Sequence, residues 1–211
     1  MNIKIKNVSK KIKNEIILDG ITLDFEGGHI YGITGRNGSG KTILLKMICG
    51  FIVPDSGEVI VNGENIYKQK TFPKNTRAMF DSLNYLNDLS GYENLELLAS
   101  IQNKIEKKDI EKVLKQVDLY SEKDKKFGKY SLGMKQKVGI AQVLMENPDI
   151  MIFDEPFNGL DDKSTIMVRK LLIEKKEEGK IVIIATHIKE DINNLCDVIY
   201  KLDSGKLKNE K

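Results

Sequence analysis

The sequence has few of the features that mark a disulfide-stabilised or membrane-inserted protein. It holds two cysteines among 211 residues. Because Cys49 and Cys196 are far apart in the chain and lie in apolar helical surroundings, we expect two reduced core residues rather than a disulfide or a metal site. No apolar run approaches the roughly 20 residues that a membrane-spanning helix needs. Direct insertion into a membrane is therefore not expected.

A strong excess of charge of one sign is also lacking. The 34 basic residues are nearly balanced by 31 acidic residues, which leaves a net charge of +3. This balance gives no electrostatic reason to expect a nucleic-acid partner. The start, Met1-Asn2-Ile3-Lys4, is typical of an alternating strand rather than a signal peptide. We therefore expect a cytoplasmic protein that reaches a membrane only through a partner.

Residues 35–42 read Gly-Arg-Asn-Gly-Ser-Gly-Lys-Thr, which is the pattern of a phosphate-binding P-loop. The residues before it suit a buried strand, and residues 43–49 suit a helix that Gly50 would end. Glycine N–H groups and the helix N-terminus would wrap a polyphosphate, Lys41 would reach the β- and γ-phosphates, and Thr42 would ligate Mg²⁺. The expected nucleotide-binding residues here are Gly35, Arg36, Asn37, Gly38, Ser39, Gly40, Lys41, Thr42 and Ile43.

The remaining pattern predicts an α/β sheet interrupted by a helical insertion. Residues 2–8 and 16–25 alternate as half-buried strands do, whereas residues 150–153 and 181–185 are short apolar runs typical of buried parallel strands. Turns are expected at Pro54–Gly57 and at Asn62-Gly63. The helices are expected from a capping box at Ser90, around 110–117, over 132–145, over 164–178 and over 188–196, with a last strand near 198–201.

The strand at 150–153 ends in two carboxylates. Asp154 is placed where a residue that orients Mg²⁺ opposite a P-loop belongs. Glu155, one residue later, would point the other way and could polarise an attacking water. A solvated acidic turn before Pro156 is the alternative, and the P-loop earlier in the chain argues against it.

The order of the motifs resembles the ATP-binding subunit of an ABC transporter over essentially the whole chain. The P-loop is followed by Ser131-Leu132-Gly133-Met134-Lys135-Gln136, then by Asp154-Glu155-Pro156, Asn158-Gly159-Leu160-Asp161 and His187. The resemblance implies a P-loop NTPase (RecA-like) α/β core with an N-terminal antiparallel β subdomain. Residues 1–81 and 146–211 would form this core, and residues 82–145 would form an all-helical insertion subdomain.

The same resemblance assigns roles to residues outside the P-loop. Ser131 and Gly133 would contact the γ-phosphate of ATP bound to the opposite subunit, and an ordinary serine helix cap is the alternative for Ser131. Asp161 would shape the dimer interface. His187 would donate to the γ-phosphate, and Glu155, His187 and Lys41 would be the catalytic residues.

Three positions depart from the family pattern. Ile12 stands where an aromatic residue usually stacks on adenine, so the base would have an aliphatic contact. Asp81 stands at the loop glutamine that links the core to the helical insertion; similar acidic loops occur in lantibiotic- and bacitracin-type exporters, and we expect it near Mg²⁺. Phe157 replaces the usual threonine after Glu-Pro.

The resulting expectation is an ATPase that binds ATP and Mg²⁺ and drives a transporter, in the direction of export. It would act as a homodimer with a separate transmembrane permease that holds it at the inner face of the cell membrane. A soluble ABC ATPase acting on ribosomes or DNA is one alternative. A small-molecule kinase is another, but its lid would need arginines near the phosphates, and the chain has three, at positions 36, 77 and 169.

Overall fold

The computed structural model describes residues 1–80, 84–188 and 190–208. In chain order the elements are β1 (Asn2–Ile12), β2 (Glu15–Glu26), β3 (His29–Thr34), α1 (Lys41–Ile48), β4 (Ser56–Val61), β5 (Glu64–Asn65), β6 (Thr76–Met79), α2 (Gly91–Gln102), α3 (Lys107–Gln116), the 3₁₀ turns η1 (Tyr120–Glu122) and η2 (Phe127–Lys129), α4 (Leu132–Leu144), β7 (Ile150–Asp154), α5 (Asp162–Glu177), β8 (Ile181–Thr186), α6 (Glu190–Asn193), β9 (Val198–Asp203) and β10 (Lys206–Lys208).

A largely parallel sheet of six strands brings the predicted motifs to one edge. Its strand order is β10-β9-β3-β8-β7-β6, and the pairs from β9 to β6 are all parallel. Thr34 at the end of β3 pairs with Thr186 at the end of β8, and Asp154 at the end of β7 pairs with Ala185. Ligands bind outside the carboxyl ends of strands in such sheets. The P-loop, the two carboxylates and His187 therefore follow neighbouring strand ends.

A second, antiparallel sheet has the strand order β2-β1-β4-β5. The connection from β4 to β5 is the expected Asn62-Gly63 turn, whose φ values of 51° and 85° are the positive angles of a type I′ hairpin turn. The turn places Val61 opposite Glu64. Strands β1 and β2 contain the alternating residues 2–8 and 16–25, so the prediction of two strands there is confirmed.

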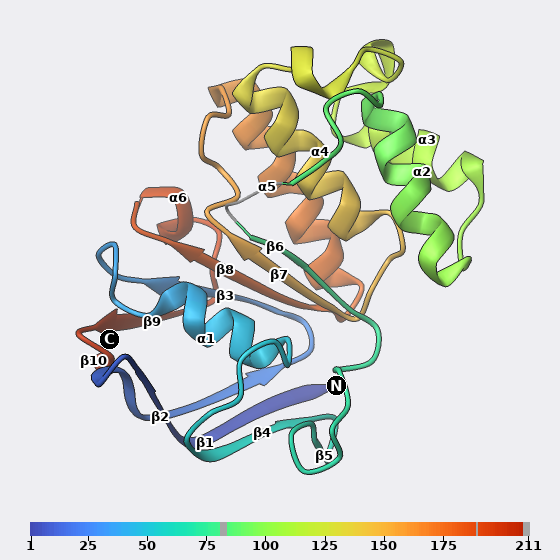
Figure 1. Ribbon diagram of the computed structural model, residues 1–211. Coiled ribbons are helices and arrows are strands. Elements are labelled where there is room, and N and C mark those ends of the chain that lie inside the picture. The colour runs from blue at the N-terminus through green and yellow to red at the C-terminus, as the bar shows by residue number, and fades with distance from the viewer. Residues whose placement is uncertain (81–83, 189, 209–211) are drawn as a thin grey trace.

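The parallel sheet separates two hydrophobic clusters. Alternation along β7 directs Ile150 and Ile152 toward the side with α1 and the antiparallel sheet, and Met151 and Phe153 toward the side with α4 and α5. Figure 1 shows α1 between the two sheets, with α4 and α5 on the opposite face of the parallel sheet. These four apolar side chains of β7 are at most 1% exposed, which anchors the strand that carries Asp154.

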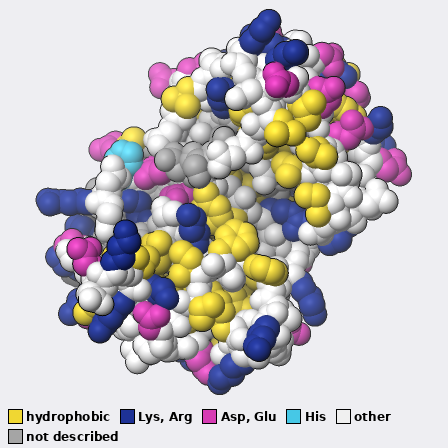
Figure 2. Space-filling view, viewed as in Figure 1, with side chains coloured by type: hydrophobic (Ala, Val, Ile, Leu, Met, Phe, Trp, Pro, Cys, Tyr) yellow, Lys and Arg dark blue, Asp and Glu magenta, His cyan; other side chains and the backbone are white. Residues whose placement is uncertain are grey.

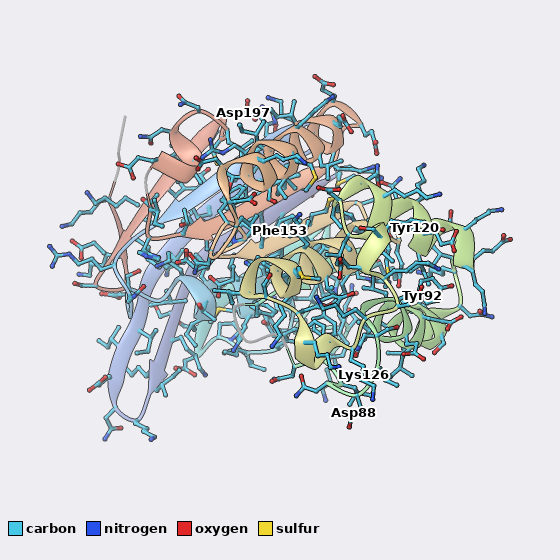
Figure 3. All side chains as sticks on the ribbon, turned by 90° about the horizontal axis from the view of Figure 1, so that it is seen from above. Asp88, Tyr92, Tyr120, Lys126, Phe153 and Asp197 are labelled. Carbon is cyan, nitrogen blue, oxygen red and sulfur yellow. The ribbon has the colours of Figure 1, made fainter. Side chains whose placement is uncertain are left out.

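The helices between β6 and β7 form a region to one side of the sheets. The capping box at the start of α2 is confirmed, because the Ser90 hydroxyl accepts from Glu93 N and Ser90 N donates to Glu93 Oε2. Figure 3 places Tyr92 and Tyr120 in this region, apart from Phe153 in the core. Helix α4 connects both parts, since it packs on α2 and α3 and also on β6 and β7. The proposed division at residues 82 and 145 stays a prediction.

Several expectations about elements need correction. Helix α6 covers Glu190–Asn193, whereas a helix over 188–196 was expected, and Cys196 lies after α6 rather than within a helix. The short strands β5, β6 and β10 had not been expected, because runs of two to four residues carry too little periodicity. In the described part of the chain, no helix is both long and apolar enough to cross a bilayer.

Candidate nucleotide site

The P-loop joins the end of β3 to α1 by a path that requires glycine. A Cβ atom on Gly35 would lie 2.2 Å from the Leu202 carbonyl oxygen of β9, so no side chain fits there. Gly40 is the N-cap of α1 with φ of 103°, in the left-handed region that favours glycine. These positions keep the loop backbone and the N–H groups at the start of α1 free to approach a phosphate.

The Lys41 side chain lies across the loop that precedes it. Its ammonium donates to the carbonyl oxygens of Gly35 at 2.7 Å and Arg36 at 3.3 Å. Its Nζ is also 3.9 Å from Glu155 Oε1, and the residue is 6% exposed. The arrangement holds one positive charge at the centre of the loop, where a polyphosphate would bring negative charge.

Thr42 and Asp154 bring together oxygen atoms from α1 and β7. The Thr42 hydroxyl donates to Asp154 Oδ2 at 2.6 Å. Among the described residues, the Ser39 hydroxyl and Glu155 Oε2 are buried without a hydrogen-bond partner. Mg²⁺ prefers a few oxygen ligands from protein together with phosphate oxygens and waters. The oxygen atoms of this site therefore fit Mg²⁺ bound together with a nucleoside triphosphate.

Glu155 adopts an unusual backbone conformation directly after β7. Its φ is 53°, in the left-handed region that non-glycine residues rarely enter. The expected alternation would have pointed Asp154 and Glu155 in opposite directions. Because the backbone turns at Glu155, both carboxylates instead line the same cavity.

The Glu155 carboxylate is bound to the segment that follows β8. Its Oε1 accepts from the backbone N–H of His187 at 3.1 Å and lies 2.9 Å from His187 Nδ1, so the tautomer with a proton on Nδ1 donates to it. The Glu155 side chain is 11% exposed, whereas that of His187 is 41% exposed. The carboxylate is therefore largely buried, whereas the histidine bonded to it is open to solvent.

One cavity of about 470 Å³ collects most of the predicted site. It is lined by Ile12, Ile17, Asn37, Gly38, Ser39, Gly40, Lys41, Thr42, Ile43, Asp154, Glu155, Asn158 and His187. Ile12, expected beside adenine, thus lies beside the P-loop. Ile17 and Asn158 also line the cavity but were not proposed as ligand contacts, and the alternation around Ile17 gave only its place in a strand.

An adjoining hollow of about 410 Å³ holds the first residues of the P-loop. Gly35 and Arg36 line it together with Thr34, Asn37, His187 and Lys201. His187 and Asn37 line both spaces. The predicted P-loop residues are therefore divided between two connected surfaces of the molecule.

Two predicted contacts lie outside both cavities. Ser131 is the N-cap of α4, where its hydroxyl accepts from Met134 N at 3.2 Å. Gly133 lies against the segment after Glu155, since a Cβ there would be 2.7 Å from the Gly159 carbonyl oxygen. Neither residue lines the surface that holds Lys41. Asp81, expected near the metal, lies outside the described residues.

Asp161 and the two cysteines have structural surroundings. Asp161 caps α5 by accepting from Ser164 N at 2.7 Å, and its hydrogen bonds to Ser164 lower the pKa of its carboxyl. Burial raises the pKa of the Cys49 and Cys196 thiols to about 12, which keeps both protonated. Both cysteines are free, with Cys49 buried and Cys196 half-buried.

Comparison with known proteins identifies the family. The profile of the ABC transporter family matches residues 18–158. An ABC transporter ATP-binding protein of Bacillus subtilis (strain 168), YybJ, is 40% identical over 205 residues, which cover 97% of this chain and 94% of the relative. The bacitracin transport ATP-binding protein BcrA of Enterococcus faecalis is 36% identical over 211 residues, which cover 99% of this chain and 68% of the relative.

Solved structures agree with this assignment. The ATP-binding subunit of an ABC transporter superimposes with a TM-score of 0.89 at 25% identity, covering 100% of this chain and 90% of the other. A dimeric ATP-binding cassette in a post-hydrolysis state, bound to ADP and Pi, superimposes with a TM-score of 0.88 at 27% identity, covering 99% and 97%. The P-loop NTPase fold expected from the motifs is thus confirmed, and the chain belongs to the ABC transporter family as an ATP-binding and ATP-hydrolysing subunit.

Proposed function

We propose that this chain hydrolyses ATP on the surface formed by the P-loop, Asp154, Glu155 and His187 and that it thereby drives export through a separate membrane protein. The observation that carries the proposal is the meeting of these groups around one cavity of about 470 Å³. Lys41 and the N–H groups at the start of α1 would bind the phosphates. Thr42 and Asp154 would hold Mg²⁺, which would neutralise charge on the phosphate oxygens.

Glu155 is the proposed general base for the attacking water. Its Oε1 is occupied by the two hydrogen bonds from His187, while its buried Oε2 has no partner among the described residues. Oε2 is thus available to accept a proton from water. His187 would orient the carboxylate and present its exposed edge to the γ-phosphate.

A second copy of the chain would complete the site. Ser131 and Gly133 lie at the start of α4, away from the cavity that holds Lys41. A helix N-terminus with a serine hydroxyl suits a phosphate, but it needs a phosphate from another molecule. The structural relative solved as a dimer with ADP and Pi supports this arrangement. We therefore propose a homodimer in which each copy contributes to the other's site.

An apolar docking face provides a place for the membrane partner. We define it by Phe51, Phe72, Leu86, Leu97 and Ile101, each at least 50% exposed. Figure 2 shows hydrophobic side chains gathered across this side of the molecule. Exposed apolar groups that cluster in this way mark protein contacts. We propose that a cytoplasmic segment of the permease binds here and holds the chain at the membrane.

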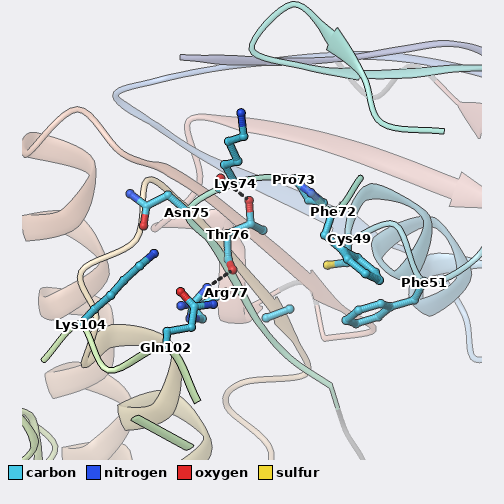
Figure 4. Close-up of a pocket in the computed structure, with 11 residues that line it drawn as sticks. Cys49, Phe51, Phe72, Pro73, Lys74, Asn75, Thr76, Arg77, Gln102 and Lys104 are labelled. Carbon is cyan, nitrogen blue, oxygen red and sulfur yellow. Dashed lines mark hydrogen bonds between the residues drawn. The ribbon is translucent and has the colours of Figure 1, made fainter. Parts of the chain in front are cut away.

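Two hollows give this face its shape. One, of about 430 Å³, has Phe51 and Phe72 on one side and Arg77, Gln102 and Lys104 on the other (Figure 4). The other, of about 280 Å³, is lined by residues that include Leu86 and Leu97. Both touch Ala78 in β6, so they are neighbours. Asp81 follows β6 closely in the chain, and its role in coupling the metal site to the partner stays a prediction.

The role in transport rests on the relatives. BcrA of Enterococcus faecalis and its counterpart from Bacillus licheniformis, 36% identical over 210 residues, are both named bacitracin transport proteins. This likeness supports a transporter subunit, while export is proposed from the resemblance of the motifs and the transported substance stays open. The soluble ABC ATPase receives no support from these transporter subunits, and the small-molecule kinase leaves the Ser131 segment without a role.

The proposal is tested by substituting Lys41. Lys41→Ala removes the charge that faces the β- and γ-phosphates, so Mg-ATP affinity and turnover should both fall by at least about tenfold. Lys170→Ala, on an exposed position of α5, is the matched control and should keep both. Unchanged ATP affinity in Lys41→Ala, measured by titration calorimetry, would show that the P-loop does not bind the nucleotide.

A further inference from the structure

The backbone of Glu155 is fixed at both of its polar groups. Its N–H donates to the Ala185 carbonyl oxygen of β8 at 2.8 Å. Its carbonyl oxygen accepts from the side-chain amide of Gln136 at 2.7 Å, and also from Asn158 N at the longer distance of 3.3 Å. Gln136 comes from α4, while Glu155 follows β7, so the contact joins two elements that meet only through the fold.

Gln136 lies in an unusual place for its chemistry. It is 5% exposed and its amide is aimed at a backbone carbonyl rather than at solvent. The residue that carries this carbonyl has φ of 53°, a conformation that persists when the surroundings hold it in place. A buried donor at 2.7 Å from a left-handed residue fits such a restraint.

We infer that Gln136 is a positioning residue for ATP hydrolysis: its amide holds the left-handed backbone of Glu155 and so directs the Glu155 carboxylate toward the cavity. The inference rests on the proposed role of Glu155 as the general base. Gln136 is not among the residues that line the cavity, and its amide reaches Glu155 through the backbone carbonyl. A displacement of the carboxylate by about 1 Å can cost as much as 10²-fold in rate.

The same contact connects α4 with the hydrolytic carboxylate of its own chain. Helix α4 begins at the Ser131 cap, and Gln136 lies in its first two turns. In the proposed dimer, ATP on the other copy would meet this end of α4. Gln136 then joins the surface that contacts the partner's nucleotide to the residue that hydrolyses the chain's own nucleotide.

Gln136→Met tests the inference, because methionine keeps the length and volume of the side chain but has no donor. The Glu155 carbonyl would still have its bond from Asn158, so folding should survive. We expect kcat to fall by about 10- to 100-fold with the ATP dissociation constant unchanged within about twofold. Gln142→Met is the matched control: it lies in the same helix, accepts from the Tyr85 hydroxyl and should keep kcat.

A second arm separates positioning from a general loss of structure. In the Glu155→Gln background, Gln136→Met should lower the residual hydrolysis no further, since the base through which it acts is already gone. If Gln136→Met fails to fold, Gln136→Asn takes its place. Its shorter side chain does not reach the carbonyl, so it should show the same loss of kcat. Thermal unfolding of each variant accompanies the kinetics.

Three results would overturn the inference. One is a kcat in Gln136→Met equal to that of Gln142→Met. Another is an independent, multiplying loss in the Glu155→Gln background. The third is wild-type hydrolysis in Glu155→Gln alone, which would remove the general base and with it the proposed mechanism. The first two leave the role of Glu155 intact, so failure of the inference can be told from failure of the proposed function.

Discussion

At the scale of single residues, Glu155 combines an unfavourable backbone conformation with a buried carboxylate that has a role in the proposed chemistry. A non-glycine residue held in the left-handed region costs about 1–3 kcal/mol. The bonds to Ala185, Gln136 and His187 offset that cost. The strained conformation places the carboxylate beside Lys41, at 3.9 Å, where an undistorted strand end would have directed it elsewhere.

Thr42 gives the clearest single-residue prediction. Thr42→Val keeps the shape of the side chain but removes the hydroxyl that donates to Asp154 at 2.6 Å, so the proposed Mg²⁺ ligand would be lost. Hydrolysis should fall by roughly 10²-fold or more, as expected for loss of a metal that stabilises transition-state charge. Thr42→Ser keeps the hydroxyl and should retain most of the activity. Phosphate release at several Mg²⁺ concentrations measures both, and equal rates in the two variants would contradict the metal site.

At the scale of elements, the N-cap of α4 has two possible uses. The Ser131 hydroxyl already accepts from Met134 N, which is the bond of an ordinary cap. The residue is nevertheless exposed at a helix N-terminus, beside the exposed Leu132. The capping role and the proposed phosphate contact therefore have to be separated by experiment.

Ser131→Asp separates them, because aspartate caps a helix as well as serine does but repels phosphate. Thermal stability should stay within about 1 kcal/mol of wild type, while ATP hydrolysis should collapse. Ser131→Asn keeps the cap without the charge and should remain active. Full hydrolysis by Ser131→Asp would assign Ser131 to capping alone.

Asp197, the residue before β9, links β3 and α5 through its carboxylate. Its Oδ2 accepts from Ile30 N at 2.8 Å and its Oδ1 from the Lys176 ammonium at 2.7 Å. Burial alone would raise the pKa of this carboxyl, but the Ile30 bond and Lys176 outweigh it and lower the pKa. A lowered folded-state pKa means that the carboxylate stabilises the fold above its unfolded pKa of about 3.9 and loses this effect as the pH falls through the folded value.

Asp197→Asn should therefore be pH-selective. At pH 7 the free energy of unfolding should fall by about 1 kcal/mol, and the difference from wild type should shrink below about pH 3.9. Asp124→Asn, at a side chain that is 83% exposed, is the control. Urea unfolding at pH 7 and at pH 3 measures the effect. An equal loss of unfolding free energy at the two pH values would refute the linkage.

At the scale of the whole molecule, structure that follows from long apolar runs or specific motifs could be predicted from the sequence. Short strands and strained backbone could not. The apolar runs at 150–153 and 181–185 gave the buried strands, and the P-loop gave Lys41 and Thr42 their shared surface with Asp154. Periodicity does not reveal a positive φ, so the prediction that the Glu155 side chain points away from that of Asp154 was wrong. The contact from Gln136 to a backbone carbonyl 19 residues away likewise leaves no trace in residue types.

The proposed sharing of sites between two copies follows from geometry at this scale. Within one chain, Ser131 and Gly133 lie outside the cavity lined by Lys41 and Glu155. Two surfaces that both bind an anion have no electrostatic attraction for each other until an anion lies between them. ATP would supply that charge, so association should depend on the nucleotide.

The measurement that tests this arrangement most directly is the mass of Glu155→Gln by light scattering with and without Mg-ATP. The amide cannot act as a base, so bound ATP should persist and hold two copies together. We predict a shift from 23.9 kDa toward twice that mass at saturating Mg-ATP. Adding Ser131→Arg should prevent the shift by placing bulk at the interface. A single species of 23.9 kDa at saturating Mg-ATP would contradict the shared sites.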